Sequence, residues 1–244
     1  MEMKITVYQC TSPYVLARTE EILNVAREAF SDVPDEAIVG RLKKYPEIAM
    51  AEDEVGIAGF VFPTPHACGR YRMVGLRFLT VGNRCRNRKL STLLTGVVLV
   101  RAYRKYMAER LLPGGPTQLY VMARICNPKA YYTLTKGNAG VSPELGLTNP
   151  GDLVAEREEI YRWMEPELGL TEFDISTGLV ADGAAGAGII PTNTEVGLDD
   201  QSDWSRYVPV GSEVMVLMTL DWKYLLNNAM RVVRLLKPKR LRKY

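Results

Sequence analysis

The sequence predicts a mixed α/β fold in a single domain. Several short runs alternate apolar and polar residues as strands do, and the run at 3–9 is the first of them. By contrast, apolar residues recur every three or four positions near the start of 90–111, which is the spacing of a helix that buries one side. The chain has 244 residues, of which 47% are hydrophobic and 24% charged, so it is long enough to bury a large core.

The other elements follow from the same two periodicities and from the turn and cap residues between them. Strands are expected over 3–9, over 48–62 as a hairpin with an acidic turn at 52–54, and over 73–81, 118–125 and 214–220. Helices are expected over 13–30, 35–42, 90–111, 127–136, 151–165 and 222–236. Ser12 is the expected cap of the first helix and Asp152 that of the fifth, and the Gly/Ala-rich tract 183–188 is expected to be a flexible loop.

Composition argues against several function classes. The one histidine, His66, excludes a multi-histidine metal site, and no apolar run reaches the roughly 20 residues that span a bilayer. A serine hydrolase triad would have to use His66, which we expect in an exposed Thr-Pro-His-Ala loop, and the sequence has no Gly-x-Ser-x-Gly elbow. The four cysteines form no Cys-x-x-Cys pair, and no signal peptide is recognised, so we expect reduced thiols in a cytoplasmic protein.

A basic loop between an expected strand and an expected helix is the most informative segment. It contains Arg84, Arg86, Arg88 and Lys89 and leads directly into the helix at 90–111. The first amides of a helix have no intrahelical acceptor and lie at the positive end of its dipole, so such a terminus binds anions. With these cationic side chains beside it, the loop is suited to a diphosphate.

This segment resembles the central motif of the GCN5-related N-acetyltransferase (GNAT) superfamily. In that motif a strand ends in valine, an arginine or glutamine follows five residues later, and two glycine places lie at the helix start. Here Val81 is followed five positions later by Arg86, and Lys89 and Ser91 stand in the two glycine places. The hairpin before the motif and the Asn-Pro-Lys-Ala stretch at 127–130 are also similar to the family, so that the resemblance covers 1–137.

The resemblance implies a GNAT fold, which has a mixed, mostly antiparallel, twisted sheet of about six or seven strands flanked by helices. Two parallel strands of this sheet splay apart at the cofactor site, and this chain would add an extended C-terminal half. On this expectation the single domain has a CoA-binding core at 1–137 and an insertion or acceptor region at 138–212. The last strand and helix follow at 213–236, and a basic tail at 237–244 ends the chain.

The resemblance also implies which residues hold an acyl-CoA cosubstrate. By position, the expected cofactor contacts are Leu79, Thr80, Val81, Arg86, Asn87, Arg88, Lys89, Leu90, Ser91, Thr92, Asn127 and Ala130. The backbone amide of Leu79 or Val81 is the candidate hydrogen-bond donor to the thioester carbonyl. Neither glycine of the motif is present, so a different binding mode at Lys89, or a loop that binds nothing, stays open.

The proton donor to the leaving thiolate does not carry over from the family. Its tyrosine would stand at position 134, which is a leucine here. We therefore expect Tyr132, and next Tyr131, to be the catalytic tyrosine, against the alternative that both are packing residues.

The general base also has no candidate in the expected motif strand. The strand before the loop contains no carboxylate, and Glu52 and Glu54 are expected in a solvated turn. Asp174 and Asp182 are the remaining candidates, or the base acts through water.

The predicted function is an acyl-CoA-dependent N-acyltransferase that moves an acetyl or longer acyl group to an amine by direct attack. The acceptor is left open among a small molecule, a peptide lysine and a protein N-terminus, and no metal is expected. The alternative is a non-catalytic acyl-CoA-binding module with a regulatory or peptide-binding role. The net charge of +3 lies mainly in two short clusters, which disfavours a nucleic-acid partner. The basic C-terminal end favours a core-packed helix with a solvated tail, while peripheral membrane contact and oligomerisation stay open.

Overall fold

The structure, a computed structural model, describes most of the chain. The described residues are 3–31, 33–86, 89–126, 128–135, 141–142, 155–170, 172–181, 190–191, 204, 207–209 and 212–226. Helices are α1 Pro13–Leu16, α2 Thr19–Ala29, α3 Asp35–Lys44, the 3-10 turn η1 Asn83–Cys85, α4 Leu90–Arg110, α5 Pro128–Thr135 and α6 Ala155–Glu167. Strands are β1 Lys4–Gln9, β2 Phe30–Ser31, β3 Glu47–Asp53, β4 Gly56–Cys68, β5 Tyr71–Val81, β6 Gln118–Ile125, β7 Val141–Ser142, β8 Phe173–Asp174, β9 Leu179–Val180, β10 Ile190–Pro191 and β11 Glu213–Thr219.

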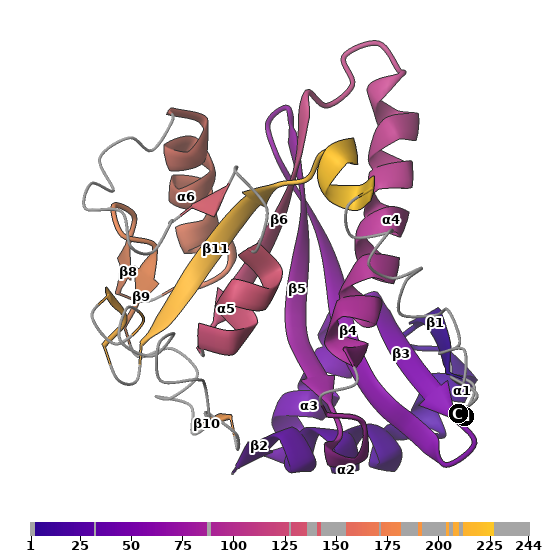
Figure 1. Cartoon of the computed structure of the whole chain (residues 1–244). Coiled ribbons are helices and arrows are strands. Elements are labelled where there is room, and N and C mark those ends of the chain that lie inside the picture. Colours follow the sequence, from indigo (N-terminus) through magenta and orange to yellow (C-terminus); the bar gives the residue numbers. More distant parts are fainter. Residues whose placement is uncertain are drawn as a thin grey trace, which may run out of the picture.

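One large sheet organises the molecule (Figure 1). Its strand order is β1-β3-β4-β5-β6-β11-β9-β8, with β7 also paired to β11. Within the described residues every pairing in it is antiparallel except that of β5 with β6. The expected mixed, mostly antiparallel sheet flanked by helices is therefore confirmed. The strands beyond the expected six or seven are two-residue pieces from the 138–212 region.

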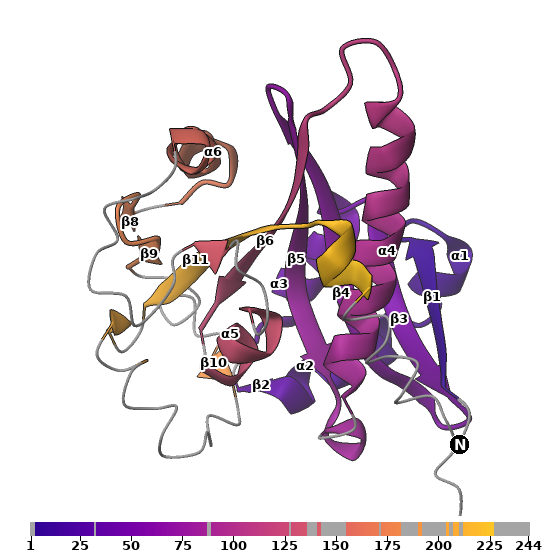
Figure 2. The same cartoon turned by 45° about the horizontal axis from the view of Figure 1, so that its top comes forward.

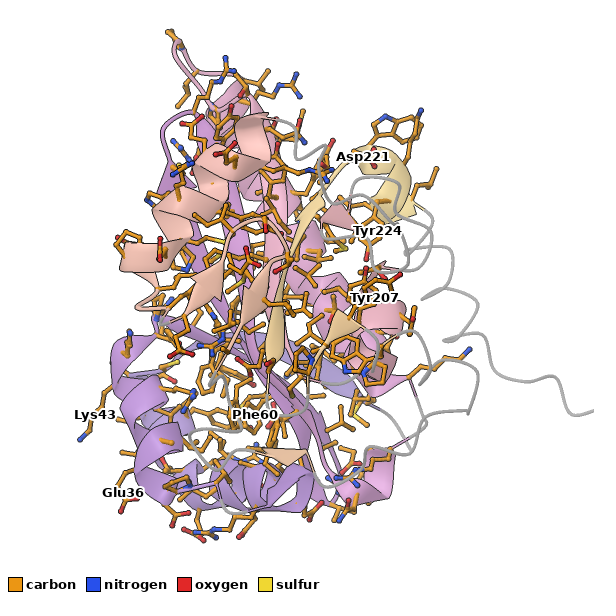
Figure 3. All side chains as sticks on the ribbon, turned by 90° about the vertical axis from the view of Figure 1, so that its left-hand side faces the viewer. Glu36, Lys43, Phe60, Tyr207, Asp221 and Tyr224 are labelled. Atoms are coloured by element: carbon orange, nitrogen blue, oxygen red, sulfur yellow. The ribbon has the colours of Figure 1, made fainter. Side chains whose placement is uncertain are left out.

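Helices cover both faces of the sheet. α4 and α5 pack on one face, where Leu94 and Val98 of α4 meet the apolar side chains of β3 to β6. On the opposite face α1, α2 and α3 cover one end of the sheet, and α6 covers the other end. Figure 3 views the molecule from the side, with α6 above α2 and α3. Figures 1 and 2 show the helical segment 222–226 beside α4.

The N-terminal helix differs from its prediction. The expected helix at 13–30 is two helices, α1 and α2, separated at Ala17 and Arg18, and Phe30 lies in a strand. The start is as expected, because Ser12 accepts a hydrogen bond from the amide of Val15. At the break, Arg18 forms an ion pair with Glu52 of β3. Both helices bury apolar residues against the same end of the sheet, so the periodicity continues across the break.

Strand β4 runs farther than its prediction, through Cys68, and this corrects the expected position of His66. The histidine lies in β4 opposite Met73 of β5, and its side chain is partly buried, so it is not in an exposed loop. The prolines at 63 and 65 obscured the strand. They are tolerated because the pairing of β3 with β4 ends at Ala49 opposite Val61, which leaves the far edge of β4 without a ladder partner.

Candidate functional site

The parallel strands β5 and β6 part from each other in the middle of the sheet. Their register runs from Tyr71 opposite Gln118 to Gly75 opposite Met122. Beyond this last pair β5 continues to Val81 beside β4, whereas β6 continues to Ile125 beside β11. We call the region between the two strands beyond Gly75 the opening. It corresponds to the splay expected at the cofactor site.

A bulge in β5 lies at the edge of the opening. Arg77 pairs with Phe62, but Thr80 pairs with Phe60, so β5 has one extra residue between these two pairs. Phe78 has a φ of 55°, and its carbonyl accepts a hydrogen bond of 2.9 Å from the hydroxyl of Thr80. The bulge puts the Phe78 ring on the α2–α3 face, 4.6 Å from the ring of Phe30. Arg77 and Phe78 thus both belong to this face, although they are adjacent in sequence.

The end of β5 presents backbone groups to the opening. The amide of Gly82 donates to the carbonyl of Ala58 on β4, over 2.9 Å. Because successive amides of a strand point to opposite edges, the Val81 amide points away from β4 and toward the opening. The side chains of Leu79 and Val81 pack against the core under α4 and α5, and Thr80 is buried. These are the residues expected to contact the cofactor; the contact itself stays a prediction.

The basic loop is held by α2. The amide of Asn83 donates to the carboxylate of Glu28 over 2.7 Å, and the Arg86 guanidinium donates to the Glu28 backbone carbonyl over 2.6 Å. Cys85 is buried below the loop. The acceptor of this Arg86 bond is a neutral carbonyl.

Arg84 of the basic loop has a carboxylate partner. Its guanidinium forms an ion pair with Asp53, and it also donates to the carbonyl of Gly56 over 2.9 Å. The Arg84 ion pair holds the pKa of Asp53 below its usual range. Arg84 therefore links the loop to the β3–β4 turn, and Asp53 balances its charge.

Helix α4 begins at the loop without an acidic cap. Lys89, its N-cap, has a φ of 58° and a ψ of 22°, which is the left-handed conformation that glycine adopts most easily. The first bond of the helix ladder runs from the amide of Leu93 to the carbonyl of Lys89. The amides of Leu90, Ser91 and Thr92 precede that bond, and the first turn contains no carboxylate. This end of α4 therefore has the donors and the positive dipole that suit a phosphate.

The two expected tyrosines lie on α5. Tyr131 is buried in the core, with its ring 5.3 Å from that of Tyr132 and 5.9 Å from that of Trp204. Tyr132 is partly buried against the same core. At Leu134, the place of the family's tyrosine, the backbone carbonyl accepts a 3.0 Å hydrogen bond from the hydroxyl of Tyr224. Figure 3 labels Tyr224 near Tyr207 and Asp221.

Sequence reasoning missed Tyr224 as a phenol close to this position. It stands 90 residues away in the chain, and no motif surrounds it. Its placement depends on the return of β11 to the middle of the sheet, which the local sequence does not encode.

The expected carboxylate bases have other partners. Glu52 is not in a solvated turn, because it lies within β3 and accepts hydrogen bonds from Tyr8, Tyr14 and Arg18. Asp174 accepts from Ser176 over 2.6 Å. Burial favours a higher pKa for Asp174, but hydrogen bonds from its own turn outweigh it and lower the pKa. Asp182 lies outside the described residues.

His66 is a weak base in this environment. Burial lowers its pKa to about 4, and the positive charges of Arg77 and Lys44 contribute to the shift. Its ring lies 5.7 Å from that of Trp163 on α6. Of the buried side-chain nitrogen and oxygen atoms in the described part of the chain, the Nε2 atom of His66 is the one without a hydrogen-bond partner.

Three arginines at the opening also escaped the sequence analysis. Arg77 of β5, Arg124 of β6 and Arg41 of α3 lie close together: the charges of Arg124 and Arg41 lower the pKa of Arg77, and that of Arg124 lowers the pKa of Arg41. Glu213 of β11 accepts a hydrogen bond of 2.6 Å from Arg124. A usable signal was present, since an arginine within an otherwise apolar strand requires an explanation.

The remaining expected site residues are placed as follows. Ala130 is exposed on α5, while Asn87, Arg88 and Asn127 lie outside the described residues, as do most of the expected helix at 222–236 and the basic tail. In the part of the chain that the structure describes, no group of three or more metal-ligating side chains occurs. A search of the same residues found no helix with the length and hydropathy to cross a membrane.

Sheet order and strand divergence define the fold class. A hairpin precedes the bulged strand β5, the basic loop leads into α4, and the parallel neighbour β6 parts from β5 and is followed by α5. This is the arrangement that the GNAT resemblance predicts, and the fold is of the GNAT type.

Solved structures of N-acetyltransferases are similar to the chain. A GCN5-related N-acetyltransferase from Kribbella flavida has 14% identity and a TM-score of 0.38. The match covers 57% of this chain and 33% of the Kribbella flavida chain. The GNAT-family protein YhbS from Escherichia coli, in complex with CoA, has 19% identity and a TM-score of 0.39. The match covers 55% of this chain and 67% of the YhbS chain. An aminoglycoside 6'-acetyltransferase of type Ii has 17% identity and a TM-score of 0.40. The match covers 57% of this chain and 86% of the acetyltransferase chain. No protein-family model and no curated protein sequence matches the chain.

Proposed function

We propose that the protein is an acyl-CoA-dependent N-acyltransferase that moves an acetyl or longer acyl group to an amine. The observation that carries the proposal is the divergence of β5 from β6 immediately before a basic loop and the uncapped start of α4. Where two parallel strands separate inside a sheet, they expose backbone donors and acceptors that would otherwise be paired with each other. An extended amide-containing chain such as pantetheine can pair with them.

The donor would lie across the end of β5 and the start of α4. The Val81 amide is directed at the opening, and the pantetheine arm would run beside Leu79, Thr80 and Val81. The diphosphate would accept hydrogen bonds from the backbone amides of 90–92 and lie beside the positive charge of Arg86. Asn87, Arg88, Lys89, Asn127 and Ala130 complete the proposed cofactor set.

The reaction would be a direct transfer. The amine nitrogen attacks the thioester carbon and forms the C–N bond, and the C–S bond then breaks to release the CoA thiolate. The Val81 amide would stabilise the oxyanion that forms between these events. The ammonium must first lose a proton, which water can accept. The attacking nitrogen must also lose its second proton, and a phenol would give its own proton to the thiolate and be reprotonated by this one; Tyr132 and Tyr224 are the candidates.

Thermal unfolding with acetyl-CoA tests the donor. A ligand at about 100 times its Kd stabilises a protein by about 2.7 kcal/mol, so Tm should rise by roughly 5–10 °C for a chain of this size. Arg86→Ala should reduce this rise. Arg84→Ala is the matched control: it removes the same charge from the same loop but from a side chain already paired with Asp53, so the rise should persist.

Two outcomes bear on the proposal. If neither acetyl-CoA nor any longer acyl-CoA changes Tm in the wild-type protein, the donor assignment is wrong. If acyl-CoA binds but a panel of amines releases no CoA thiol, the non-catalytic alternative holds, which the leucine at 134 favours. In an active protein, Tyr132→Phe or Tyr224→Phe should slow thiol release without reducing the Tm shift.

A further inference from the structure

Two arginines face each other across the opening. Gly75 of β5 and Met122 of β6 form the last pair of the parallel register. Arg77 and Arg124 each stand two residues beyond this pair, so both side chains lie on the face that Gly75 and Met122 share. It is the face that carries α3 and α6, because Met122 packs under α6 and Arg77 pairs across the ladder with Phe62 of the α2–α3 core.

The two arginines have different surroundings. Arg124 donates to Glu213 over 2.6 Å, and Glu213 is 5% exposed. The Arg77 side chain is partly buried, and its guanidinium makes no hydrogen bond or ion pair with any residue that the structure describes. Burial lowers the pKa of Arg77, the charges of Arg124 and Arg41 add to that lowering, and Tyr45 and Glu213 oppose it.

Arg41 completes the cluster from α3. Its guanidinium carbon lies 4.7 Å from the centre of the Phe78 ring, and one nitrogen donates to the Ala37 carbonyl over 2.6 Å. The bulge in β5 is what turns Phe78 to this face. Within the described part of the chain, Arg41 thus holds its guanidinium beside β5 by stacking and by a neutral acceptor.

The described cluster has excess positive charge. Three guanidinium groups lie near one carboxylate, Glu213, which leaves a net charge of +2. Removing an unpaired charge from water is unfavourable unless a counter-charge replaces the water. A guanidinium also offers paired donors that match a carboxylate or a phosphate. The cluster therefore has the charge and the donors of an anion-binding site.

We propose that the acceptor is an amine that also carries a carboxylate or a phosphate, and that Arg77 binds this anionic group, with Arg41 and Arg124 beside it. The inference rests on the proposed function, which puts the thioester at the same opening. The proposed donor site uses the basic loop and the α4–α5 face, where Leu79 and Val81 pack. The arginines lie on the opposite face, so they are available to the second substrate.

His66 provides a probe of binding that does not depend on catalysis. It is the single histidine of the chain, and its ring senses the charge of Arg77. At low ionic strength and pH 7, the NMR signals of this ring should shift when β-alanine or phosphoethanolamine is added. β-Alaninamide and ethanolamine, which lack the anionic group, should shift them much less.

Variants of β5 residues test whether Arg77 is responsible for the shift of the His66 signals. Arg77→Met should abolish the response to the anionic amines. Arg77→Lys should weaken it, because the positive charge remains but the paired donors of the guanidinium are lost. Arg72→Met is the matched control on the same strand, since Arg72 is paired with Glu109 of α4 on the other face. It should retain the response. The wild-type comparison between anionic and neutral amines needs no variant to fold.

Acyl-transfer kinetics distinguish acceptor from donor. With acetyl-CoA, KM should be at least about tenfold lower for the anionic amines than for their neutral partners, and Arg77→Met should remove this preference. The proposal is overturned if the anionic amines neither shift the His66 signals nor show a lower KM. It is also overturned if the preference lies with the donor, so that succinyl-CoA is favoured over acetyl-CoA and the acceptor's charge has no effect. Anion binding at Arg77 without any acyl-CoA binding would instead contradict the proposed function and leave the anion site standing.

Discussion

Lys89 shows how a residue can depart from a motif while the backbone keeps the motif's shape. It stands in a glycine place, and its φ of 58° is in the left-handed region. An L-residue there is less stable by about 1–2 kcal/mol than in the right-handed region, because its Cβ approaches the carbonyl oxygen. The conformation lets the loop enter α4, so the substitution preserved geometry at an energetic cost and added a charge.

Substitutions at Lys89 should separate conformation from charge. Lys89→Gly and Lys89→Ala remove the same charge, but glycine alone is free of the left-handed penalty. We expect Lys89→Gly to be more stable than Lys89→Ala by roughly 1 kcal/mol, after allowing for the greater freedom of glycine in the unfolded chain. Differential scanning calorimetry should show a Tm difference of about 2–4 °C. Equal melting temperatures would mean that the residue carries no backbone strain.

The arginines of the loop mark a limit of prediction at this scale. Arg84 and Arg86 are the same residue type in the same loop, and nothing local distinguishes them. Asp53, which lies 31 residues earlier, forms an ion pair with Arg84, whereas Arg86 donates to the backbone carbonyl of Glu28. Charge in a motif can be read from sequence, but the partner of each charge cannot.

Among the elements, the contact of α4 with the sheet depends on Gly59 of β4. A Cβ at this position would lie 2.7 Å from the Thr80 carbonyl oxygen and 3.3 Å from the Leu94 side chain. The absence of a side chain therefore lets α4 and the end of β5 approach β4. Any larger residue would push against the backbone of the strand that forms the proposed donor site.

Two glycine-to-alanine substitutions should have opposite effects. Gly59→Ala should lower the free energy of unfolding by about 1–3 kcal/mol, since the added methyl group overpacks the sheet. Gly40→Ala should raise it by about 0.5–1 kcal/mol, because Gly40 lies within α3 and an added Cβ would meet nothing within 4 Å. Urea unfolding at neutral pH measures both. If Gly59→Ala were as stable as the wild type, the close approach would not limit packing.

Errors in the predicted elements have one physical origin. Alternation and helical periodicity report which side of an element is buried, and they do not report where the chain turns. The pattern at 13–30 continues through the break at Arg18 because α1 and α2 share a buried face. The strand at 56–68 was shortened because proline disfavours a paired strand, and pairing is decided by the neighbour.

At the scale of the whole molecule, His66 lies between two parts that are distant in sequence. It belongs to β4 and contacts Trp163 of α6. Folding buries its ring beside the charges of Arg77 and Lys44, so the folded state disfavours the protonated form. The ordinary pKa of histidine, 6.5, applies to the unfolded chain, and the folded value is about 4.

This difference predicts a pH dependence of stability. Below pH 6.5 the unfolded chain takes up a proton at His66 that the folded chain does not, so the free energy of unfolding falls as the pH is lowered toward about 4. Below that value both states are protonated and the loss levels off. Urea unfolding of wild type and His66→Gln between pH 7 and 4 measures the effect, since contributions from carboxylates are common to both. A constant difference between the two proteins would contradict it.

The sequence by itself determined the order of the elements, the GNAT-type fold class and the position of the basic loop before a helix. These features are encoded locally, in hydrophobic periods, caps and a motif with fixed spacing. The tertiary structure decided which carboxylate pairs with Arg84, where Tyr224 reaches α5, and that Arg41, Arg77 and Arg124 gather at one opening. Such contacts join residues from different strands and helices, and their energies depend on burial and distance, which exist only once the sheet has formed.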